Sequence, residues 1–465
     1  MQELGDVDVV IIGAGAAGLA AARTLRAAGV RIVVLEARGR VGGRIFTYRD
    51  PRAPVPIELG AEFLHGNTPL TNEIIADAKL TAYEVVGDHW RANGGKLKQN
   101  DEIWRRIERV MDKLDAHRSP DSSFADYLTT YVRKPKLARD RRLACEFVQG
   151  FHAADVSRIS AQSLANNGGP GVGDDDDRMG RVLDGYDRVT AWLARDVYDA
   201  VSFNTIVERV TWEPGRVQIE ARSADGETRI TYHAQAVVVT VPLSILQRSS
   251  PELGGIEFSP DVPSMRHAVT HLAMGSVVRV IFAFREPFWE HRRIDQTASG
   301  NALAQMSFLH GRGTDLPTWW TLFPLRLSVI VGWTGGPAAA ELAEDDDDAI
   351  QHRALTSLAH HLGTTVRRLE SLVEGSWFHN WERDPFTYGA YSYPLVGGKH
   401  SAAQLGQPVD GTLFFAGEAA VTQGHHGTVE GALSTGQRAA HALVETLTWG
   451  TPSESGTAQE PEQTF

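Results

Sequence analysis

Apolar and polar runs at the start of the chain predict the opening of a parallel α/β sheet. Apart from Asp8, residues 7–12 are apolar and β-branched, which is typical of a buried strand. After a glycine-rich turn, residues 16–28 carry apolar side chains at helical spacing up to Gly29, a typical helix stop. Residues 31–36 (RIVVLE) repeat the apolar strand pattern. Strand, turn, helix and strand in this order begin an α/β fold.

Further along the chain, the pattern changes twice. Charged segments with helical periodicity occupy residues 71–183, so we assign them to a separate helical part of the molecule. Short apolar strand patterns then return in residues 217–221, 236–242, 279–284 and 327–333. The last apolar run, residues 412–418, precedes a predicted helix over residues 428–447. The end of the chain therefore repeats the strand, turn and helix of its start.

Length and charge narrow the class of protein. At about 100 to 200 residues per domain, 465 residues predict two to four domains. The 58 acidic and 46 basic side chains leave a formal charge of -12, which disfavours nucleic acid and anionic lipid and favours cationic small molecules as partners. We interpret the acidic runs 174–177 and 344–348 as solvated loops. Residues 450–465 are rich in Ser, Glu, Gln and Pro, which predicts a disordered tail.

Cysteine usage and the N-terminal residues bear on location. The single cysteine, Cys145, excludes an intramolecular disulfide and a cysteine-based metal cluster and suits a reducing compartment. The first ten residues lack the basic and apolar regions of a signal peptide. The longest uncharged stretch, residues 9–22, is too short to span a bilayer of about 30 Å. The sequence therefore predicts a cytoplasmic protein without a membrane anchor.

Three glycines in GAGAAG lie where a dinucleotide-binding turn places them. Gly13 permits a tight turn, Gly15 lets a pyrophosphate approach the backbone, and Gly18 lets the helix pack on the strand. The helix N-terminus adds amide donors and a partial positive charge. Glu36, which ends the second strand, would accept hydrogen bonds from ribose hydroxyls. The alternative is that small residues only relieve crowding at the turn, and the motif alone does not separate FAD from NAD.

Longer segments extend this motif over almost the whole chain. EARGRVGGRIFT and IELGAEFLHG follow it, and five ordered blocks come later: LDGYDRVTAWLA, AVVVTVPLSIL, MGSVVRVIFAF, WERDPFTYGAYSY and FFAGEAAVTQGHHGTVEGALSTG. With these segments the chain resembles the flavin-dependent amine oxidases, which include monoamine oxidases, polyamine oxidases and flavin-type histone lysine demethylases. The resemblance implies an α/β fold of two lobes, a Rossmann-like FAD-binding domain and an α+β substrate-binding domain.

The resemblance also implies how the two domains divide the chain. FAD-binding segments are expected at residues 1–70, 184–262 and 405–449. Substrate-domain segments are expected at residues 71–183 and 263–404. The substrate pocket should lie between the two domains.

Cofactor contacts of the family carry over onto matching residues of this chain. Arg44 would pair with the pyrophosphate, although a surface arginine is the alternative, and Glu418 would hold the ribityl chain. Amide groups of Thr428 and Val429 would point to the pyrimidine edge of the flavin. FAD should be noncovalent, because Ala390 stands where monoamine oxidases carry the linking cysteine. The expected FAD-binding residues are Gly13, Gly15, Ala16, Ala17, Gly18, Glu36, Ala37, Arg38, Gly43, Arg44, Gly60, Ala61, Glu62, Phe63, Val207, Trp381, Gly417, Glu418, Thr428 and Val429.

On the substrate side, the resemblance singles out an aromatic cage. Tyr391 matches one wall of this cage in front of the flavin. Thr428 stands where monoamine oxidases have a second tyrosine, which points to the polyamine oxidase and demethylase branch. His65 lies where polyamine oxidases place a polar residue, so it is a candidate for substrate binding or proton transfer, with a structural histidine as the alternative.

Arg279 departs from the family pattern. In that pattern a lysine holds a water against flavin N5 and is tied to reoxidation by oxygen, whereas MGSVVR places an arginine here. Arginine keeps its charge at any working pH, so the change is not conservative. We count Arg279 among the candidate catalytic residues. Binding of a substrate carboxylate and support of the sheet are the alternatives.

Two further patterns are interpreted as structural. Trp381 and Phe386 could line the pocket, but large aromatic residues at such spacing more often belong to the core. His425 and His426 lack a third ligand at metal-binding spacing, so no metal site is predicted.

The reaction implied by the resemblance is oxidation of an amine C–N bond. A neutral polyamine or monoamine would pass a hydride to flavin N5, the imine would hydrolyse to an aldehyde or ketone, and oxygen would regenerate FAD with release of hydrogen peroxide. A dehydrogenase or desaturase with another electron acceptor is an alternative that would fit Arg279. An L-amino-acid oxidase ranks lower, because Glu62, Phe63 and Leu64 occupy the stretch where those relatives bind carboxylate with an arginine. A flavin-containing chromatin protein is disfavoured, because a tower-like insertion and a basic surface are absent.

Overall fold

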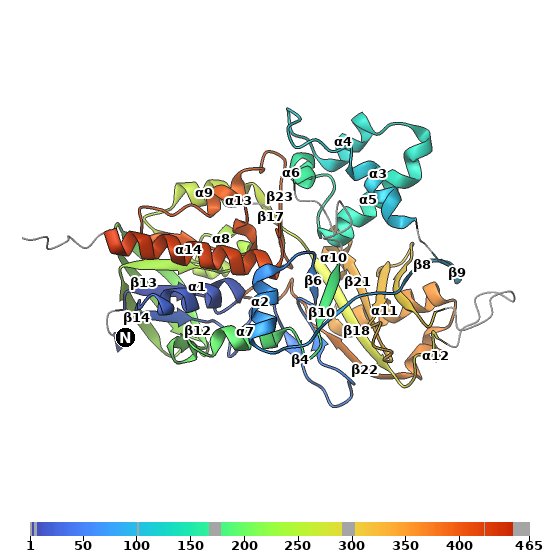
Figure 1. Cartoon of the computed structure of the whole chain (residues 1–465), viewed down its shortest axis with the longest axis horizontal. Helices are drawn as coiled ribbons and strands as arrows, with labels where there is room; N and C mark the ends of the chain where they lie inside the picture. Colours follow the sequence, from blue (N-terminus) through green and yellow to red (C-terminus); the bar gives the residue numbers. More distant parts are fainter. Residues whose placement is uncertain are drawn as a thin grey trace, which may run out of the picture.

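Five apolar runs pair as one parallel sheet in the lobe at the left of Figure 1. Their order is β11 (Val201–Ser202), β3 (Ile32–Leu35), β2 (Val9–Ile12), β15 (Ala236–Val239) and β24 (Leu413–Phe415). Each strand runs parallel to its neighbours. The computed structural model describes residues 2–3, 7–99, 102–166, 178–290, 303–422 and 424–449. The α/β fold expected from the N-terminal pattern is confirmed.

Both faces of the parallel sheet are buried, because alternate side chains of β2 are apolar on either side. Val9 packs against the layer formed by α1 (Ala16–Ala27) and α14 (Val429–Trp449), whereas Val10 belongs to the core on the opposite face. A Cβ atom on Gly436 would lie 2.2 Å from a backbone carbonyl oxygen of α1. Glycine at this position therefore lets α14 pack directly on α1.

A second sheet covers the opposite face of the parallel sheet. Its order is β1 (Gln2–Glu3), β14 (Arg229–Ala234), β13 (Arg216–Ser223), β12 (Thr205–Glu213) and β16 (Glu257–Ser259). Apolar side chains from β12, β13 and β14 share one core with the parallel sheet. This lobe is therefore made from segments far apart in the sequence.

The other lobe is built on a seven-stranded sheet. Its order is β22 (Val373–Phe378), β18 (Val277–Phe284), β21 (Val329–Gly335), β20 (Thr318–Thr321), β19 (Met306–His310), β8 (Asp88–Asn93) and β9 (Lys96–Gln99). All eight residues of β18 are buried, as expected of a central strand. Helices α10 (Pro337–Leu342) and α11 (Asp347–Leu362) pack against this sheet.

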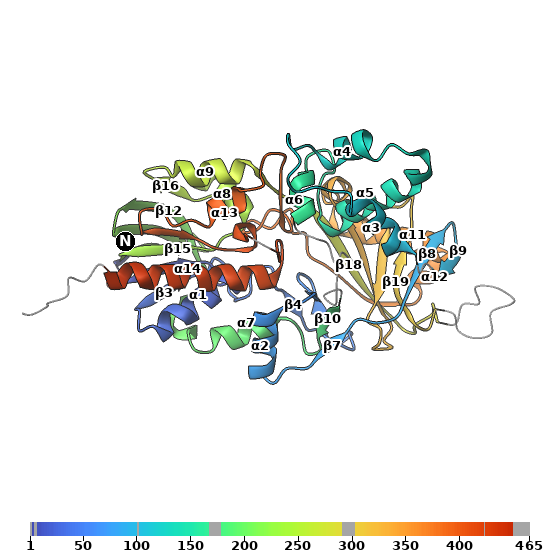
Figure 2. The same cartoon turned by 45° about the horizontal axis from the view of Figure 1, so that its top comes forward.

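Four helices stand beside the seven-stranded sheet, at the upper right of Figures 1 and 2. They are α3 (Ile103–Met111), α4 (Phe124–Tyr131), α5 (Ala138–Phe151) and α6 (Ala161–Asn166). They correspond to the predicted helical part, residues 71–183. That stretch also supplies β8 and β9 to the large sheet, which its helical pattern did not indicate.

Small elements join the two lobes. They are α2 (Pro69–Asp77), α7 (Asp187–Ala194), a three-stranded sheet of β6 (Phe63–His65), β10 (Met179–Val182) and β7 (Ala82–Glu84), and the pair β17 (Leu272–Met274) and β23 (Ser392–Pro394). Glu430 of α14 accepts hydrogen bonds from the backbone amides of Leu70 and Thr71. It thereby satisfies free amides at the N-terminus of α2.

Of the two acidic runs that the sequence predicts to be loops, the structure describes residues 344–348. Part of the acidic run 344–348 is helical instead of a loop, because Asp346 caps α11 by accepting a hydrogen bond from the amide of Ala349. The run 174–177 and the tail 450–465 lie outside the described residues. Within the described ranges, none of the helices combines the length and the apolarity that a bilayer crossing requires.

Candidate active site

One cavity of about 1520 Å³ extends between the two lobes. Gly13 and Glu36 line it in the parallel-sheet lobe, His65 and Tyr391 line it between the lobes, and Arg91 lines it beside the seven-stranded sheet. Typical ligand pockets measure about 300 to 1,000 Å³. The cavity therefore has room for a large cofactor and a substrate together.

The glycine turn has the geometry that its sequence predicts. Gly13 has a φ of +104°, and a Cβ atom on Gly18 would lie 1.8 Å from the Gly13 carbonyl oxygen. Larger residues are therefore excluded from both positions. A Cβ atom on Gly15 would meet no protein atom within 4 Å, so the space in front of this residue is open. Gly15 is the N-cap of α1, which directs the amides of the helix N-terminus towards the cavity.

Glu36 stabilises this turn from the end of β3. Its carboxylate accepts the backbone N–H of Ala14 at 2.7 Å and that of Arg38 at 2.9 Å. The residue is 5% exposed, and burial raises the pKa of its carboxyl group above the usual range. Glu36 therefore holds the chain around the turn, in addition to lining the cavity.

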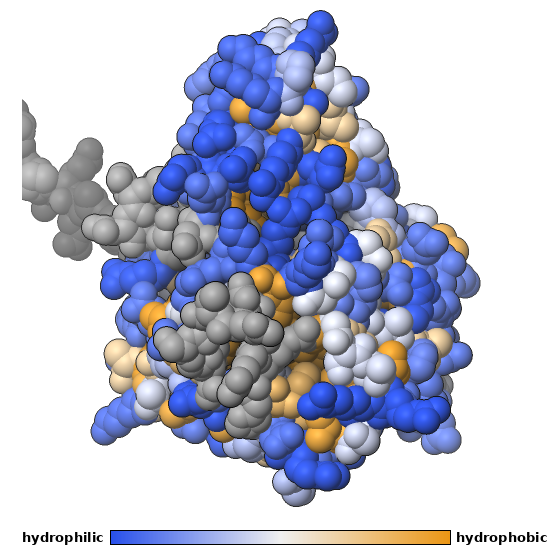
Figure 3. All heavy atoms as spheres, turned by 90° about the vertical axis from the view of Figure 1, so that its right-hand side faces the viewer, coloured by the Kyte–Doolittle hydropathy of each residue, from blue (hydrophilic) through white to orange (hydrophobic). Residues whose placement is uncertain are grey.

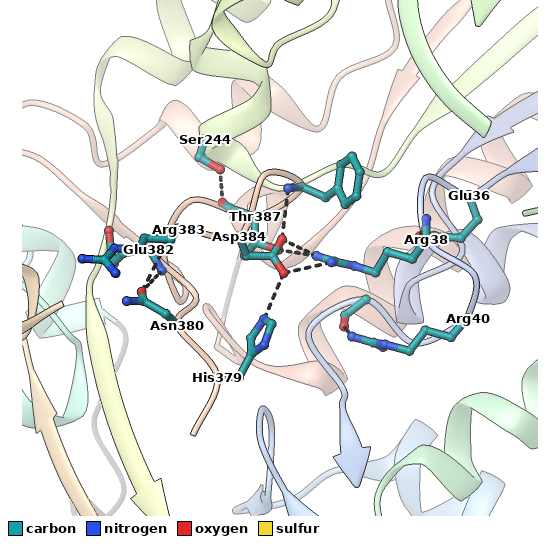
Figure 4. Close-up of polar contacts among 12 residues, drawn as sticks. Glu36, Arg38, Arg40, Ser244, His379, Asn380, Glu382, Arg383, Asp384 and Thr387 are labelled. Carbon is teal, nitrogen blue, oxygen red and sulfur yellow. Dashed lines mark hydrogen bonds and ion pairs between the residues drawn. The ribbon is translucent and has the colours of Figure 1, made fainter. Parts of the chain in front are cut away.

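The side chain of Arg38 is held by the protein itself (Figure 4). Its guanidinium donates to both carboxylate oxygens of Asp384, at 2.6 and 2.9 Å, and to Oγ1 of Thr387 at 2.9 Å. His379 Nε2 lies 2.9 Å from the same carboxylate. Burial works to raise the pKa of Asp384, but His379 and Arg38 outweigh it and lower this pKa. The predicted cofactor residue Arg38 thus joins the segment after β3 to residues 379–387.

Arg44 and Glu418 form an ion pair that lines the cavity. Arg44 Nη1 donates to Glu418 Oε1 at 2.9 Å and to the Ala390 carbonyl oxygen at 2.7 Å. Ser392 Oγ donates to the other carboxylate oxygen at 2.7 Å. Burial works to raise the pKa of Glu418, but Arg44, His426 and Ser392 outweigh it, so Glu418 stays charged. The structure brings these two predicted cofactor residues together from opposite ends of the chain.

Tyr391 is fixed in the wall of the cavity. Its hydroxyl donates to the Phe151 carbonyl oxygen at 2.6 Å, and burial raises the pKa of this hydroxyl. A Cβ atom on Gly427 would lie 3.2 Å from the Tyr391 ring, so the backbone packs closely on one side of the ring. Thr428 accepts the Gly431 amide at 3.1 Å and so caps α14. Thr428 lines the cavity, and its hydroxyl also donates to the His425 carbonyl oxygen at 2.6 Å.

Two histidines that line the cavity lie beside Phe151. The ring of Phe151 is 5.5 Å from the His65 ring and 5.1 Å from the His152 ring, measured between centroids. In the described part of the chain, no group hydrogen-bonds to Nδ1 of His65 or Nε2 of His152. Burial lowers the pKa of both rings to about 4, so both are neutral at physiological pH. Sequence reasoning missed His152, because no motif surrounds this residue at the end of α5.

Arg279 belongs to a buried ionic cluster. It donates to Glu62 Oε2 at 2.5 Å and to the Gly60 carbonyl oxygen at 2.7 Å. Arg181 donates to the other Glu62 oxygen at 2.5 Å, and Trp320 Nε1 lies 3.2 Å from Glu62 Oε2. Burial works to raise the pKa of Glu62, but Arg279 and Arg181 outweigh it and keep the carboxyl group charged. Sequence reasoning missed Arg181, since β10 carries no recognisable signal.

The remaining predicted residues also lie along the cavity. Ala16, Ala17, Ala37, Gly43, Gly60, Ala61, Phe63, Val207, Gly417 and Val429 all line it. Trp381 lines it and donates to the Leu59 carbonyl oxygen at 2.8 Å. Phe386 lies 5.2 Å from the Arg38 guanidinium. His426 Nε2 lies 3.2 Å from Ser392 Oγ, and the described residues contain no group of three or more His, Cys, Asp or Glu placed to hold a metal.

Together, the glycine turn at a parallel sheet and the cavity beneath a second lobe define a two-lobed α/β enzyme. A family model described as "Flavin containing amine oxidoreductase" matches residues 16–444. The chain therefore belongs to this family of flavin-dependent oxidoreductases, and its cofactor is a flavin.

Similar proteins agree with this family. Polyamine oxidase 2 of Arabidopsis thaliana is 29% identical over 93% of this chain and 87% of its own. Human lysine-specific histone demethylase 2 is 26% identical over 94% of this chain and 53% of its own. Putrescine oxidase in complex with putrescine has a TM-score of 0.77 at 22% identity, over 96% of this chain and 100% of its own. Cyclohexylamine oxidase from Brevibacterium oxydans also shares the fold, with a TM-score of 0.76 at 22% identity, over 96% of this chain and 100% of its own.

Proposed function

We propose that the protein oxidises the C–N bond of a small-molecule amine, using noncovalently bound FAD and molecular oxygen, and forms an aldehyde or ketone and hydrogen peroxide. The observation that carries this proposal is the single cavity that extends from the glycine turn to Tyr391, His65 and His152. One part offers the groups that a dinucleotide needs, and the other shields a small substrate from water.

FAD fits the residues of the parallel-sheet lobe. The open space in front of Gly15, at the N-terminus of α1, suits a pyrophosphate. Arg44 and Glu418 would meet the pyrophosphate and the ribityl chain, and Val207 would meet the adenine. Cys145 does not line the cavity, which supports noncovalent attachment. In this proposal the FAD-binding segments are residues 1–70, 184–262 and 405–449, and the substrate segments are residues 71–183 and 263–404.

The chain offers neutral groups that would position an uncharged amine. When bound, the flavin supplies the two-electron oxidation of the amine. His65 and His152 are neutral and carry ring nitrogens without partners among the described residues, so they can hydrogen-bond to the substrate nitrogen. Tyr391 presents a ring held in place by its bond to Phe151, against which an amine can be oriented.

The protonation state of the substrate sets the expected pH dependence. An ammonium group has no lone pair to donate, so turnover should rise between about pH 6 and about pH 9 as the substrate deprotonates. The two histidines do not produce this rise, because they are already neutral above about pH 4. A rate that is flat over this range would contradict amine oxidation.

A second candidate function is that of a dehydrogenase that passes electrons to an acceptor other than oxygen. The observation that favours it is the pairing of Arg279 with Glu62 and Gly60, which keeps a permanent charge where the family pattern has a lysine. Anaerobic bleaching of the flavin by an amine without aerobic release of peroxide would select this function.

One experiment tests the proposal as a whole. The purified protein should show a flavin spectrum, and acid precipitation should release FAD into the supernatant. Peroxide release is then measured with monoamines, diamines, polyamines and amino acids. Diamines and polyamines are tested first, because the similar proteins include a polyamine oxidase and a putrescine oxidase. A colourless protein that does not bind added FAD would overturn the proposal.

We also propose a cytoplasmic location, which the single cysteine supports.

A further inference from the structure

The cavity is bordered by one face of the seven-stranded sheet. β8 and β19 pair in parallel with Arg91 opposite His310 and Trp90 opposite Leu309. Side chains alternate along a strand, so Arg91 shares its face with His89, two residues away, and both line the cavity. Trp90 and Leu309 point to the buried core on the other face.

A row of aromatic rings connects the flavin-side segment with this sheet face. The Phe63 ring lies 6.3 Å from the Phe308 ring, and Phe308 stacks on His89 at 4.9 Å. His89 is in turn 5.6 Å from the ring of His310, and burial lowers the pKa of these two histidines to about 4 and about 3. The wall is therefore uncharged at physiological pH and suits the apolar body of a ligand.

Positive charge gathers at the end of this wall. Arg91 and Arg312 line the cavity, and Arg139 and Arg142 lie close enough on α5 to act on Arg91. Burial and these arginines lower the pKa of Arg91, and the carboxylate of Glu146 acts against them. The face that contains this end of the molecule is largely hydrophilic (Figure 3).

The described residues hold no counter-ion for the guanidinium of Arg91. Glu146 already pairs with Arg312 at 2.7 Å. Glu108 of α3 also lines the cavity, but neither it nor any other carboxylate of the described residues forms an ion pair with Arg91. An anionic group of a ligand would supply the missing partner.

We propose that the substrate amine carries a carboxylate at the end remote from its reacting nitrogen, and that Arg91 binds this carboxylate. The inference rests on the proposed function. Arg91 lies two residues beyond His89 along β8, which puts about 7 Å between these two residues, and the Phe308 ring separates His89 from Phe63 on the flavin side. An α-amino acid bears its amine and its carboxylate on one carbon, so it cannot reach both the flavin-side chamber and Arg91. A polyamine would place a second cation among these arginines.

Three amines of equal chain length test the proposal. ω-Aminohexanoate ends in a carboxylate, hexamethylenediamine in an ammonium group and hexylamine in a methyl group. Bleaching of the flavin in the holoenzyme under anaerobic conditions reports the half-reaction with the amine. The kcat/KM obtained from it does not depend on the electron acceptor. We expect kcat/KM for ω-aminohexanoate to be about tenfold or more above that for hexamethylenediamine, with the difference mainly in KM.

A charge reversal assigns the preference to Arg91. In Arg91→Glu, kcat/KM should be higher for hexamethylenediamine than for ω-aminohexanoate. For hexylamine, kcat/KM should stay within about twofold of the value for the parent protein. Arg367→Glu is the matched control, because Arg367 is exposed on α12 (Val366–Glu370) and does not line the cavity. Acetate, which offers a carboxylate without an amine, should compete with ω-aminohexanoate more strongly than with hexylamine.

The outcomes separate the two proposals. Bleaching by none of these three amines, nor by any amine of the wider screen, would overturn the proposed function and this inference with it. Preferential bleaching by hexamethylenediamine, or a substrate ratio unchanged in Arg91→Glu, would overturn the inference alone.

Discussion

The carboxylate of Glu62 accepts a hydrogen bond of 2.5 Å from Arg279, across 217 residues of sequence. Arg279 and Arg181 are 7% and 3% exposed, so two guanidinium groups share one carboxylate inside the protein. Glu62 follows Gly60 and Ala61, two residues that are expected to bind FAD and that line the cavity. The unusual arginine at position 279 is therefore matched by a carboxylate within reach of the same region.

Neutralising this carboxylate should be costly. Glu62→Gln leaves two buried guanidinium groups without a counter-charge, and we expect the free energy of unfolding to fall by about 3 to 5 kcal/mol. Urea denaturation of the apoprotein measures the change. Glu341→Gln, at an exposed position of α10, is the control and should stay within about 0.5 kcal/mol of the parent protein. A loss equal to that of the control would mean that the cluster is not charged as described.

Restoring the family lysine separates stability from oxygen chemistry. Arg279→Lys keeps a positive charge but cannot donate to both Glu62 and Gly60 with the fork of a guanidinium, so we expect a stability loss of about 1 to 2 kcal/mol. We expect anaerobic reduction by amine to persist and aerobic reoxidation to become faster. Stopped-flow absorbance measures both half-reactions. Reoxidation at the parent rate would show that Arg279 does not limit the reaction with oxygen.

The Asp384 carboxylate should support both folding and cofactor binding. Asp384→Asn removes the charge that Arg38 and His379 share, so we expect the free energy of unfolding to fall by about 2 to 4 kcal/mol. Because Arg38 also lines the cavity, the dissociation constant for FAD should rise. Thermal unfolding and flavin titration provide the two measurements. Asp77→Asn, at an exposed position of α2, should change neither quantity.

Buried histidines should make the fold sensitive to acid. Burial lowers the pKa of His65, His152 and His361 to about 4, below the ordinary value of 6.5. Between these pH values the unfolded chain binds more protons than the folded chain. The stabilisation is therefore complete above about pH 6.5 and is lost as the pH falls towards about 4.

Urea unfolding at a series of pH values measures this decline. His361→Asn removes one titrating group that lies away from the cavity. As the pH falls, the free energy of unfolding of this variant should decrease less steeply than that of the parent protein, by up to about 1.4 kcal/mol per pH unit. Identical slopes in both proteins would show that His361 is not neutral in the folded state.

His152 should contribute to substrate turnover and not to flavin binding. His152→Leu keeps an apolar group beside Phe151 but removes the ring nitrogen, and we expect kcat/KM for an amine to fall by about tenfold. The FAD spectrum and dissociation constant should stay unchanged. His65→Leu in the same background tests whether the two histidines act together. Full activity of the double variant would remove both residues from the mechanism.

Local sequence patterns predicted much of the fold because they report short-range periodicity and burial. The apolar runs at β2, β3, β15 and β18 became strands, and the segment after Gly427 became α14. β8 escaped prediction, since DHWRAN mixes polar and apolar residues. It is a strand because Trp90 packs into the core of the large sheet, a tertiary contact that no local pattern records.

Sequence by itself determined the glycine turn, the strands and helices near the two ends of the chain, and the family, because backbone freedom at Gly13 and the spacing of apolar residues are properties of neighbouring residues. Tertiary structure alone decided the electrostatics of the cavity. The net charge of -12 does not predict that several arginines lie around Arg91. The electric field in a cavity depends on which charges folding brings close together and which charges it shields. For the same reason the partners of Arg38, Glu62 and His152 became visible only in the folded chain.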